Sequence, residues 1–198
     1  VHTAKGLQDM VSPLLTLVFG YGFKIADSAF FADFRWFCKN QMGQVASLVA
    51  EKVRHHRGII ENYDAVLTNR ILELSGELQQ HYKLMQRMAD VALDGDKLRH
   101  YLGSCVGLSS QQADAAFLLP RKELKGSAGA LGDVLDCYAQ DDCGAPGTVW
   151  QAYNATTRYL THGSGHHKST EVTRARNIIL GTAGKEATKA FELASELV

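Results

Sequence analysis

The sequence predicts an α+β protein that is mainly helical, with a small antiparallel sheet near its N-terminus. Residues 1–45 are rich in aromatic and β-favouring residues, a composition typical of short strands. From about residue 44 onward, apolar residues instead recur at intervals of three and four, which indicates amphipathic helices. We therefore expect a single domain over residues 1–198, with a strand-rich part (1–45) followed by a helical part (46–198).

The N-terminal part contains candidates for two or three antiparallel strands, at Leu15–Phe19, Gly22–Ala26 and Ala29–Cys38. Gly20 and the pair Asp27-Ser28 supply turn-forming residues between them. The chain opens on Val rather than Met, so we expect an N-terminus that has been trimmed or truncated.

The most regular pattern is an apolar stripe whose members are three or four positions apart: Ile60, Tyr63, Leu67, Ile71, Leu74, Leu78, Tyr82, Met85, Met88 and Ala92. It predicts one long amphipathic helix over about 59–93 that ends at Asp94-Gly95. Such a helix is about 50 Å long, at about 1.5 Å per residue. Its stripe is either the core face of the domain or a surface that packs against a partner.

Shorter helices are expected after the long one. Ser109-x-x-Gln112 is a capping box that opens a helix, and Pro120 closes it. We expect a loop at Lys125–Ala130 and then helices at Leu131–Ala139, from Trp150 to about His162, at Thr170–Leu180 and at Lys185–Leu197.

The stretch from Trp150 to His162 carries the strongest hint of a site. Trp150, Asn154, Thr157 and Thr161 are spaced to share one face of a helix. Because this face mixes an aromatic ring with amide and hydroxyl groups, its polar side chains need partners inside the protein, across an interface or on a ligand.

The charge balance restricts the partners that the chain can have. Lys+Arg and Asp+Glu number 21 each, which argues against a broad nucleic-acid surface but not against a local one. Basic residues gather around His55 and around His166, and acidic ones in the segment 133–142. These clusters are consistent with solvated surface, with a polyanion site or with head-to-tail self-association.

The four cysteines are Cys38, Cys105, Cys137 and Cys143, without a CxxC pair or a signal peptide. This usage favours a reducing, cytoplasmic compartment. The longest apolar run near the start, Leu14–Gly20, is too short to span a bilayer, and we expect no membrane partner.

Three patterns resemble chemical motifs but fit them poorly. His162 and His166 have a metal-ligand spacing, yet Gly163 and Gly165 interrupt the helix that the spacing requires. The segment Gly181–Lys185 lacks the spacer of a phosphate loop and is better explained by Gly181 as a helix C-cap. Cys38 lies among aromatic residues, where a thiol usually serves in packing, although a nucleophile assisted by His55 or His162 stays open.

Aromatic and basic residues alternate at Phe34–Lys39, and a basic run follows. Rings can stack on bases while cations meet phosphates, a combination suited to single-stranded nucleic acid. The alternative is a strand with one buried face. The candidate nucleic-acid contacts are Arg35, Trp36, Lys39, Lys52, Arg54 and Arg57.

Several of these stretches together resemble one family, the uncharacterised phage/plasmid-like proteins of domain of unknown function 932. The resemblance covers most of residues 22–198 and is carried by Ile25–Ser28, Phe34–Met42, His56-x-Gly58, the signature Thr148-x-Trp150-x-x-Tyr153-Asn154-Ala155-x-Thr157-x-Tyr159-x-x-His162, and Gly181 with the last helix. Asp27 and Gln41 depart from the family's Asn and Gly. The resemblance implies a mobile-element context and hence DNA metabolism in a bacterial host, as an analogy.

We accordingly expect a non-enzymatic, oligomeric protein that binds single-stranded DNA and could promote annealing, with no catalytic residue, metal or cofactor. The alternative is a structural or interaction module that acts on itself or a host partner through the long helix. A third possibility is an enzyme that uses Asn154, Thr157 and His162 together with Cys38 or His56.

Overall fold

A computed structural model of the chain describes residues 11–18, 27–35, 44–48, 52–53, 63–140, 145–163, 170, 173, 177 and 181–198. Side chains are described for nearly all of these positions from Leu78 onward, and before it only for Ala65, Thr68, Asn69 and Leu72.

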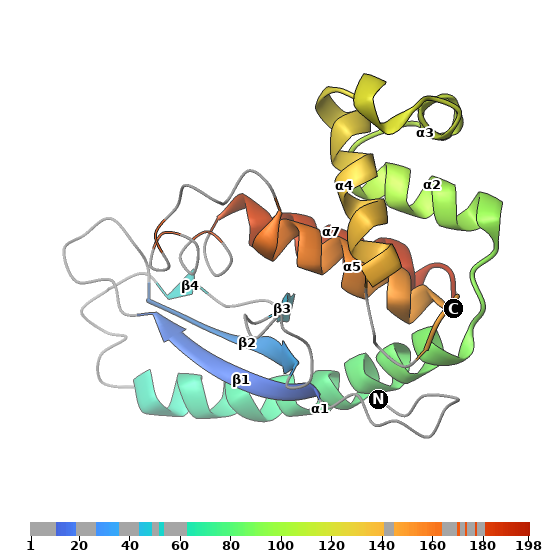
Figure 1. Ribbon diagram of the computed structural model, residues 1–198. Helices are drawn as coiled ribbons and strands as arrows, with labels where there is room; N and C mark the ends of the chain where they lie inside the picture. The colour runs from blue at the N-terminus through green and yellow to red at the C-terminus, as the bar shows by residue number, and fades with distance from the viewer. Residues whose placement is uncertain are drawn as a thin grey trace.

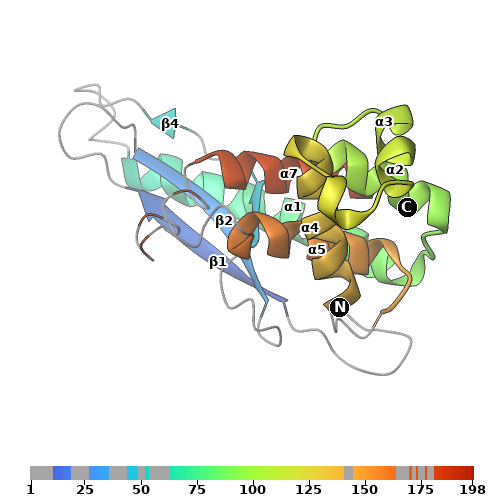
Figure 2. The same ribbon diagram turned by 45° about the horizontal axis from the view of Figure 1, so that its top comes forward.

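Six α-helices and a short 3₁₀ helix make up the larger part of what is described: α1 (Tyr63–Asp90), α2 (Gly95–Cys105), α3 (Ser110–Phe117), η2 (Arg121–Glu123), α4 (Gly126–Gln140), α5 (Val149–His162) and α7 (Thr182–Ser195). Helices α5 and α7 lie side by side, α1 runs past them on one side, and α2, α3 and α4 form a lobe on the other (Figures 1 and 2). We call residues 95–140 the lobe.

The core lies where these helices meet. Its largest wholly buried side chains are Trp150, Tyr153, Met85, Met88 and Leu102, which come from α5, α1 and α2. Small residues on α7, such as Ala190 and Ala194, are also buried, and they allow α7 to pack closely on α5. The predicted apolar stripe is therefore a core face from Leu78 to Met88, where Leu78, Met85 and Met88 are all buried, whereas its last member, Ala92, is exposed.

The predicted α+β class is wrong for the body that the structure describes in side-chain detail. We expected a small antiparallel N-terminal sheet to be part of the fold, but every buried side chain among residues 78–198 of known burial comes from a helix or from a turn between helices. The physical reason is that the described helices bury their apolar faces mainly against one another. The described body is mainly α.

Outside this body, the backbone is paired over four short antiparallel segments: β1 (Val11–Val18), β2 (Asp27–Arg35), β3 (Gln44–Leu48) and β4 (Lys52–Val53). Val11 pairs with Arg35 and Ser28 with Lys52, at opposite ends of β2. β4 and most of β3 fall in the part that was expected to be helical. The expected strand at Gly22–Ala26 lies outside the described residues.

Two connections between helices are joined by backbone hydrogen bonds. The Leu93 N–H donates to the Gly147 carbonyl over 2.8 Å, and the Val149 N–H donates to the Val91 carbonyl over 3.1 Å. The turn between α1 and α2 is thereby fixed to the entrance of α5. Within the part of the chain that the structure describes, no helix is both long enough and apolar enough to cross a membrane.

Candidate functional site

Helix α5 carries the Trp150–His162 signature and lies at the centre of the helical body. Its N-cap is Thr148, whose Oγ1 accepts from the Gln151 N–H at 3.4 Å and donates to the Ala145 carbonyl at 2.6 Å. Gly163 is its C-cap, so the predicted end of the helix at the glycines is confirmed. All residues from Val149 to Thr157 are buried, which means that α5 presents no separate polar face.

The polar side chains of the signature bond to the carbonyls of their own helix. The Asn154 Nδ2 donates to the Trp150 carbonyl over 2.8 Å, and the Thr157 Oγ1 donates to the Asn154 carbonyl over 3.0 Å. The Thr161 Oγ1 donates to the Thr157 carbonyl over 2.9 Å. The sequence left open whether these partners lie inside the protein, across an interface or on a ligand. The hydrogen bonds above are all inside the protein. Because Asn154 and Thr157 are 0% and 1% exposed, no substrate can reach them in this conformation.

The aromatic residues of α5 continue into a chain of rings that links three helices. The ring centroids of Trp150 and Tyr153 are 5.9 Å apart, and Tyr153 meets Phe191 of α7 edge-on at 5.6 Å. Phe191 in turn lies 4.2 Å from the buried ring of His81 on α1. Contacts of this kind stabilise packing beyond the area that they bury, so the signature rings hold α1, α5 and α7 together.

Helix α2 contributes a buried polar group beside α5. Tyr101 donates from its hydroxyl to the Ala190 carbonyl of α7 over 3.1 Å. The Cys105 side chain is hydrogen-bonded to Tyr101 and Thr156, and burial raises the pKa of its thiol to about 11. Burial also raises the pKa of Tyr101 well above its usual value. Since a thiol nucleophile reacts as the thiolate, this raised pKa is the opposite of what an activated cysteine needs.

Gln151 joins α5 to the end of α4. Its Nε2 donates to the Tyr138 carbonyl over 3.0 Å, and its Oε1 accepts from the Gly147 N–H over 2.7 Å. The same Gly147 accepts from Leu93. Gln151 is therefore a positioning residue for the chain entering α5.

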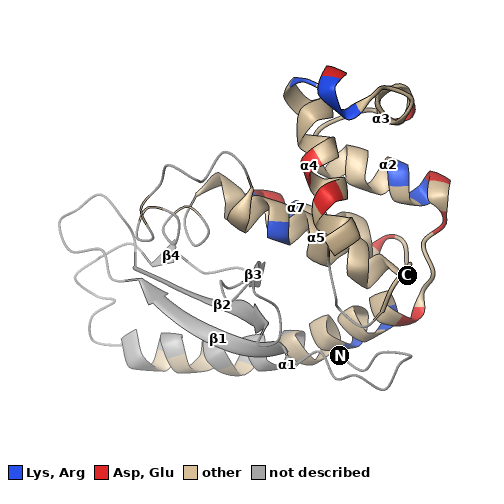
Figure 3. Cartoon of the chain, viewed as in Figure 1, with Lys and Arg blue, Asp and Glu red and all other residues tan. Residues whose placement is uncertain are grey.

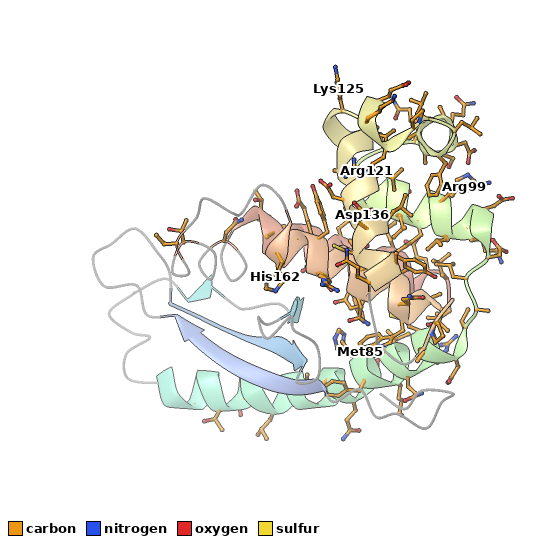
Figure 4. All side chains as sticks on the ribbon, in the orientation of Figure 1. Met85, Arg99, Arg121, Lys125, Asp136 and His162 are labelled. Carbon is orange, nitrogen blue, oxygen red and sulfur yellow. The ribbon has the colours of Figure 1, made fainter. Side chains whose placement is uncertain are left out.

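His162 is the last residue of α5 and is half-buried. Figure 4 shows it at the end of α5 that points away from the lobe. His166 and His167 lie outside the described residues. In the part that the structure describes, no group of three or more His, Cys, Asp or Glu side chains is arranged as a metal site.

The charged side chains of the lobe are largely engaged with one another. Arg121 bonds to Asp133 and lies 3.6 Å from Asp136 through its Nε, and Figure 4 shows Arg121 and Asp136 close together on the lobe. On the neighbouring helices, Arg99 pairs with Asp96 and Asp114. Two carboxylates of the acidic block, Asp133 and Asp136, thus share one arginine, Arg121.

The structure does not bring the six predicted nucleic-acid contacts into one described site. Arg35 is the last residue of β2 and Lys52 the first of β4, and only their backbone is described. Trp36, Lys39, Arg54 and Arg57 lie outside the described residues, as do Cys38, His55 and His56.

Comparison with known families adds one match. The model of the family described as "Domain of unknown function (DUF932)" matches residues 6–179. The chain belongs to this family. The resemblance seen in the sequence is thereby confirmed as to family, and residues 6–179 contain the whole of α5 within this domain of unknown function 932. No curated protein and no solved structure matches the chain.

Two features were missed by sequence reasoning: the buried cluster of Tyr101, Cys105 and Thr156, and the bonds of Gln151 to the backbone of Tyr138 and Gly147. A signal for the first existed, because Tyr101 and Cys105 are four positions apart and share a helix face. No sequence signal marks Gln151, since its two partners are backbone groups of other segments.

Proposed function

We propose that this member of the domain of unknown function 932 family is a non-enzymatic DNA-metabolism protein of a phage or plasmid, which binds single-stranded DNA through residues 35–57. It would act as an oligomer in the cytoplasm of a bacterial host, and annealing of complementary strands is the activity that such binding could support. The proposal rests on how charge is distributed along the chain.

The segment 35–57 contains five basic residues and one acidic residue, which are Arg35, Lys39, Lys52, Arg54, Arg57 and Glu51. With 21 residues of each sign in the whole chain, 16 basic and 20 acidic residues are left for all other positions. The zero net charge therefore hides a short cationic segment in an otherwise acidic chain. Binding to phosphates depends on the local number of cations that can displace counterions.

The charges of the helical body differ from those of segment 35–57, and this difference supports a DNA contact in that segment. Several of its arginines and lysines already pair with carboxylates, as in Lys97–Asp94 and Arg121–Asp133, and Figure 3 shows blue and red residues mixed over the helices. Two residues of the enzyme hypothesis, Asn154 and Thr157, are buried and bonded within α5, which speaks against their use in a reaction. Trp36 adjoins Arg35 and would supply a ring on which bases stack.

The test is binding of fluorescent single- and double-stranded oligonucleotides at about 50 and about 200 mM salt. Arg54→Glu/Arg57→Glu should weaken single-strand binding by about tenfold or more and reduce the steepness of its salt dependence by about 1.4, since each single-strand phosphate contact contributes about 0.7. The matched control is Lys185→Glu/Lys189→Glu, which makes the same charge change at two exposed positions of α7. Equal affinity of wild type and Arg54→Glu/Arg57→Glu would sink the assignment.

A second candidate is an interaction module that acts through α1. The observation that favours it is the length of α1, which has 28 residues and carries the exposed Leu72 on its N-terminal half. Light scattering on the same samples separates the two candidates. A defined oligomer that binds no oligonucleotide would favour the interaction module, whereas salt-sensitive single-strand binding would favour the DNA protein.

A further inference from the structure

The turn that follows α3 exposes two neighbouring leucines. Leu118 is 86% exposed and Leu119 is 48% exposed. They are two of the three large apolar side chains that are exposed among the residues of known burial, and the third, Leu72, belongs to α1. Single exposed leucines are common on protein surfaces, whereas adjacent ones point to a contact.

The backbone holds these leucines in place. The Leu118 N–H donates to the Ala115 carbonyl over 3.3 Å, and the Leu119 N–H donates to the Ala116 carbonyl over 3.2 Å. Pro120 then caps η2. Just before the turn, Phe117 packs against the core, with the Arg99 guanidinium 5.7 Å from its ring centre. The pair is therefore presented outward by a fixed turn.

Basic residues follow the leucine pair in sequence. Arg121, Lys122 and Lys125 are exposed and follow it directly, with Glu123 as the single acidic residue between Leu118 and Lys125. Arg121 bonds to Asp133, whereas Lys122 and Lys125 form no ion pair with any carboxylate among the residues that the structure describes. Figure 3 shows the blue residues of η2 at the far end of the lobe, and Figure 4 shows Lys125 pointing away from the body.

The shape and charge of this turn restrict its partner. Because Leu118 is 86% exposed on a turn between two helices, the pair would insert into its partner. A twofold contact with a second copy would set the same cations against each other. A specific protein interface covers about 800 Å² on each side, far more than two leucines offer. A lipid surface needs no matching shape and combines apolar depth with anionic headgroups.

We propose that Leu118 and Leu119, flanked by Lys122 and Lys125, form a contact site for an anionic lipid bilayer. The leucines enter the boundary between headgroups and acyl chains, and the two lysines meet the lipid phosphates. This contact is peripheral and reversible, since one apolar pair gives only weak anchoring. It does not depend on the proposed binding of single-stranded DNA.

The test is co-sedimentation of the full chain with vesicles of phosphatidylglycerol and phosphatidylcholine, and with vesicles of phosphatidylcholine alone. Wild type should bind the anionic vesicles better than the neutral ones. Leu118→Ser/Leu119→Ser and Lys122→Glu/Lys125→Glu should each reduce binding by about tenfold or more. Matched controls are Leu72→Ser on α1 and Lys185→Glu/Lys189→Glu on α7, which should bind as wild type does. Circular dichroism checks that each variant is folded.

The basic segment 35–57 could also attract anionic vesicles, so Arg54→Glu/Arg57→Glu is a necessary arm. Binding that survives in this variant but is lost in Leu118→Ser/Leu119→Ser supports the proposal. Binding that is lost in Arg54→Glu/Arg57→Glu and kept in the leucine variant overturns it. Failure of wild type to bind any vesicle also overturns it, and leaves a protein partner with an acidic, apolar pocket as the occupant to seek.

Discussion

Replacing Asn154 by alanine tests whether the signature helix is structural or forms a binding site. Asn154 is 0% exposed, and its amide donates to the Trp150 carbonyl at 2.8 Å. Alanine removes this bond, for a loss of about 1 kcal/mol, and leaves a small cavity that costs about 1–2 kcal/mol more. The higher helix propensity of alanine returns about 0.5 kcal/mol.

We therefore expect Asn154→Ala to lower the free energy of unfolding by about 2 kcal/mol. For a protein of this size, that corresponds to a fall in Tm of about 4–8 °C. Urea and thermal denaturation followed by circular dichroism measure both values. The matched control is Asn69→Ala, an asparagine on α1 that is exposed and should leave stability unchanged or slightly raised.

The decisive comparison adds oligonucleotide binding to the stability measurement. If Asn154 is structural, the folded fraction of Asn154→Ala binds single-stranded DNA as wild type does. A variant that is as stable as wild type but has lost binding would refute the reasoning, because the amide would then be serving a ligand.

Two further predictions concern packing and pH. Gly103→Ala should lower the free energy of unfolding by about 1–3 kcal/mol, because the new Cβ would lie 2.6 Å from the Ala113 Cβ. Gly132→Ala should change it by less than about 1 kcal/mol, because the new Cβ would meet the flexible end of the Arg121 side chain at a similar 2.6 Å. Urea denaturation of both variants checks this contrast. The pKa of the Cys105 thiol is raised from 9.0 to about 11, so the folded state holds this proton more tightly than the unfolded state. The contribution of this thiol to the free energy of unfolding is complete below pH 9 and is lost as pH rises to about 11, by at most about 2.7 kcal/mol. Cys105→Ala should therefore lose less stability than wild type over this pH range. Equal slopes of unfolding free energy against pH for variant and wild type would contradict the assignment.

The helix ends that the sequence predicted well are those set by local bonds. Ser109 and Gln112 form the expected capping box, with both reciprocal hydrogen bonds present. Gly163 ends α5 as expected, and the long helix predicted over about 59–93 spans Tyr63–Asp90. Each of these signals acts within one or two turns of helix, so neighbouring residues alone decide it.

The errors arise where one local pattern has two meanings. Asp94-Gly95 was interpreted as the end of the long helix, but Asp94 is the N-cap of α2 and accepts from the Lys97 N–H at 2.9 Å. Helix α2 was therefore missed. The segment Lys125–Ala130 was expected to be a loop because of its small residues, yet α4 begins at Gly126.

A tertiary contact explains the next glycine of α4, just beyond Lys125–Ala130. Gly132 of α4 lies directly under the Arg121 guanidinium, where a Cβ would not fit without displacing it. Small residues in α4 thus permit close approach of the preceding segment and do not mark flexibility. The fold class failed for a related reason, since no local pattern states whether a helix will be covered by a sheet or by other helices.

For the candidate site too, the local structure was predicted and its surroundings were not. Trp150, Asn154 and Thr157 were correctly placed on one helix, but whether their polar groups face a ligand depends on what surrounds that helix. The structure encloses α5 with α1, α2, α4 and α7, and its hydroxyls and amide bond inward to their own backbone. The six predicted DNA contacts stay a prediction.

The enclosure of α5 has a consequence for how this protein opens. A helix buried from Val149 to Thr157 cannot exchange its amide hydrogens with solvent until the helices around it have separated. Its amides should therefore be among the slowest to exchange in the described body, at a rate that reports global unfolding. The amides of Leu118 and Leu119, by contrast, donate within a local turn at the surface, so they should exchange by local opening and faster than the amides of α5.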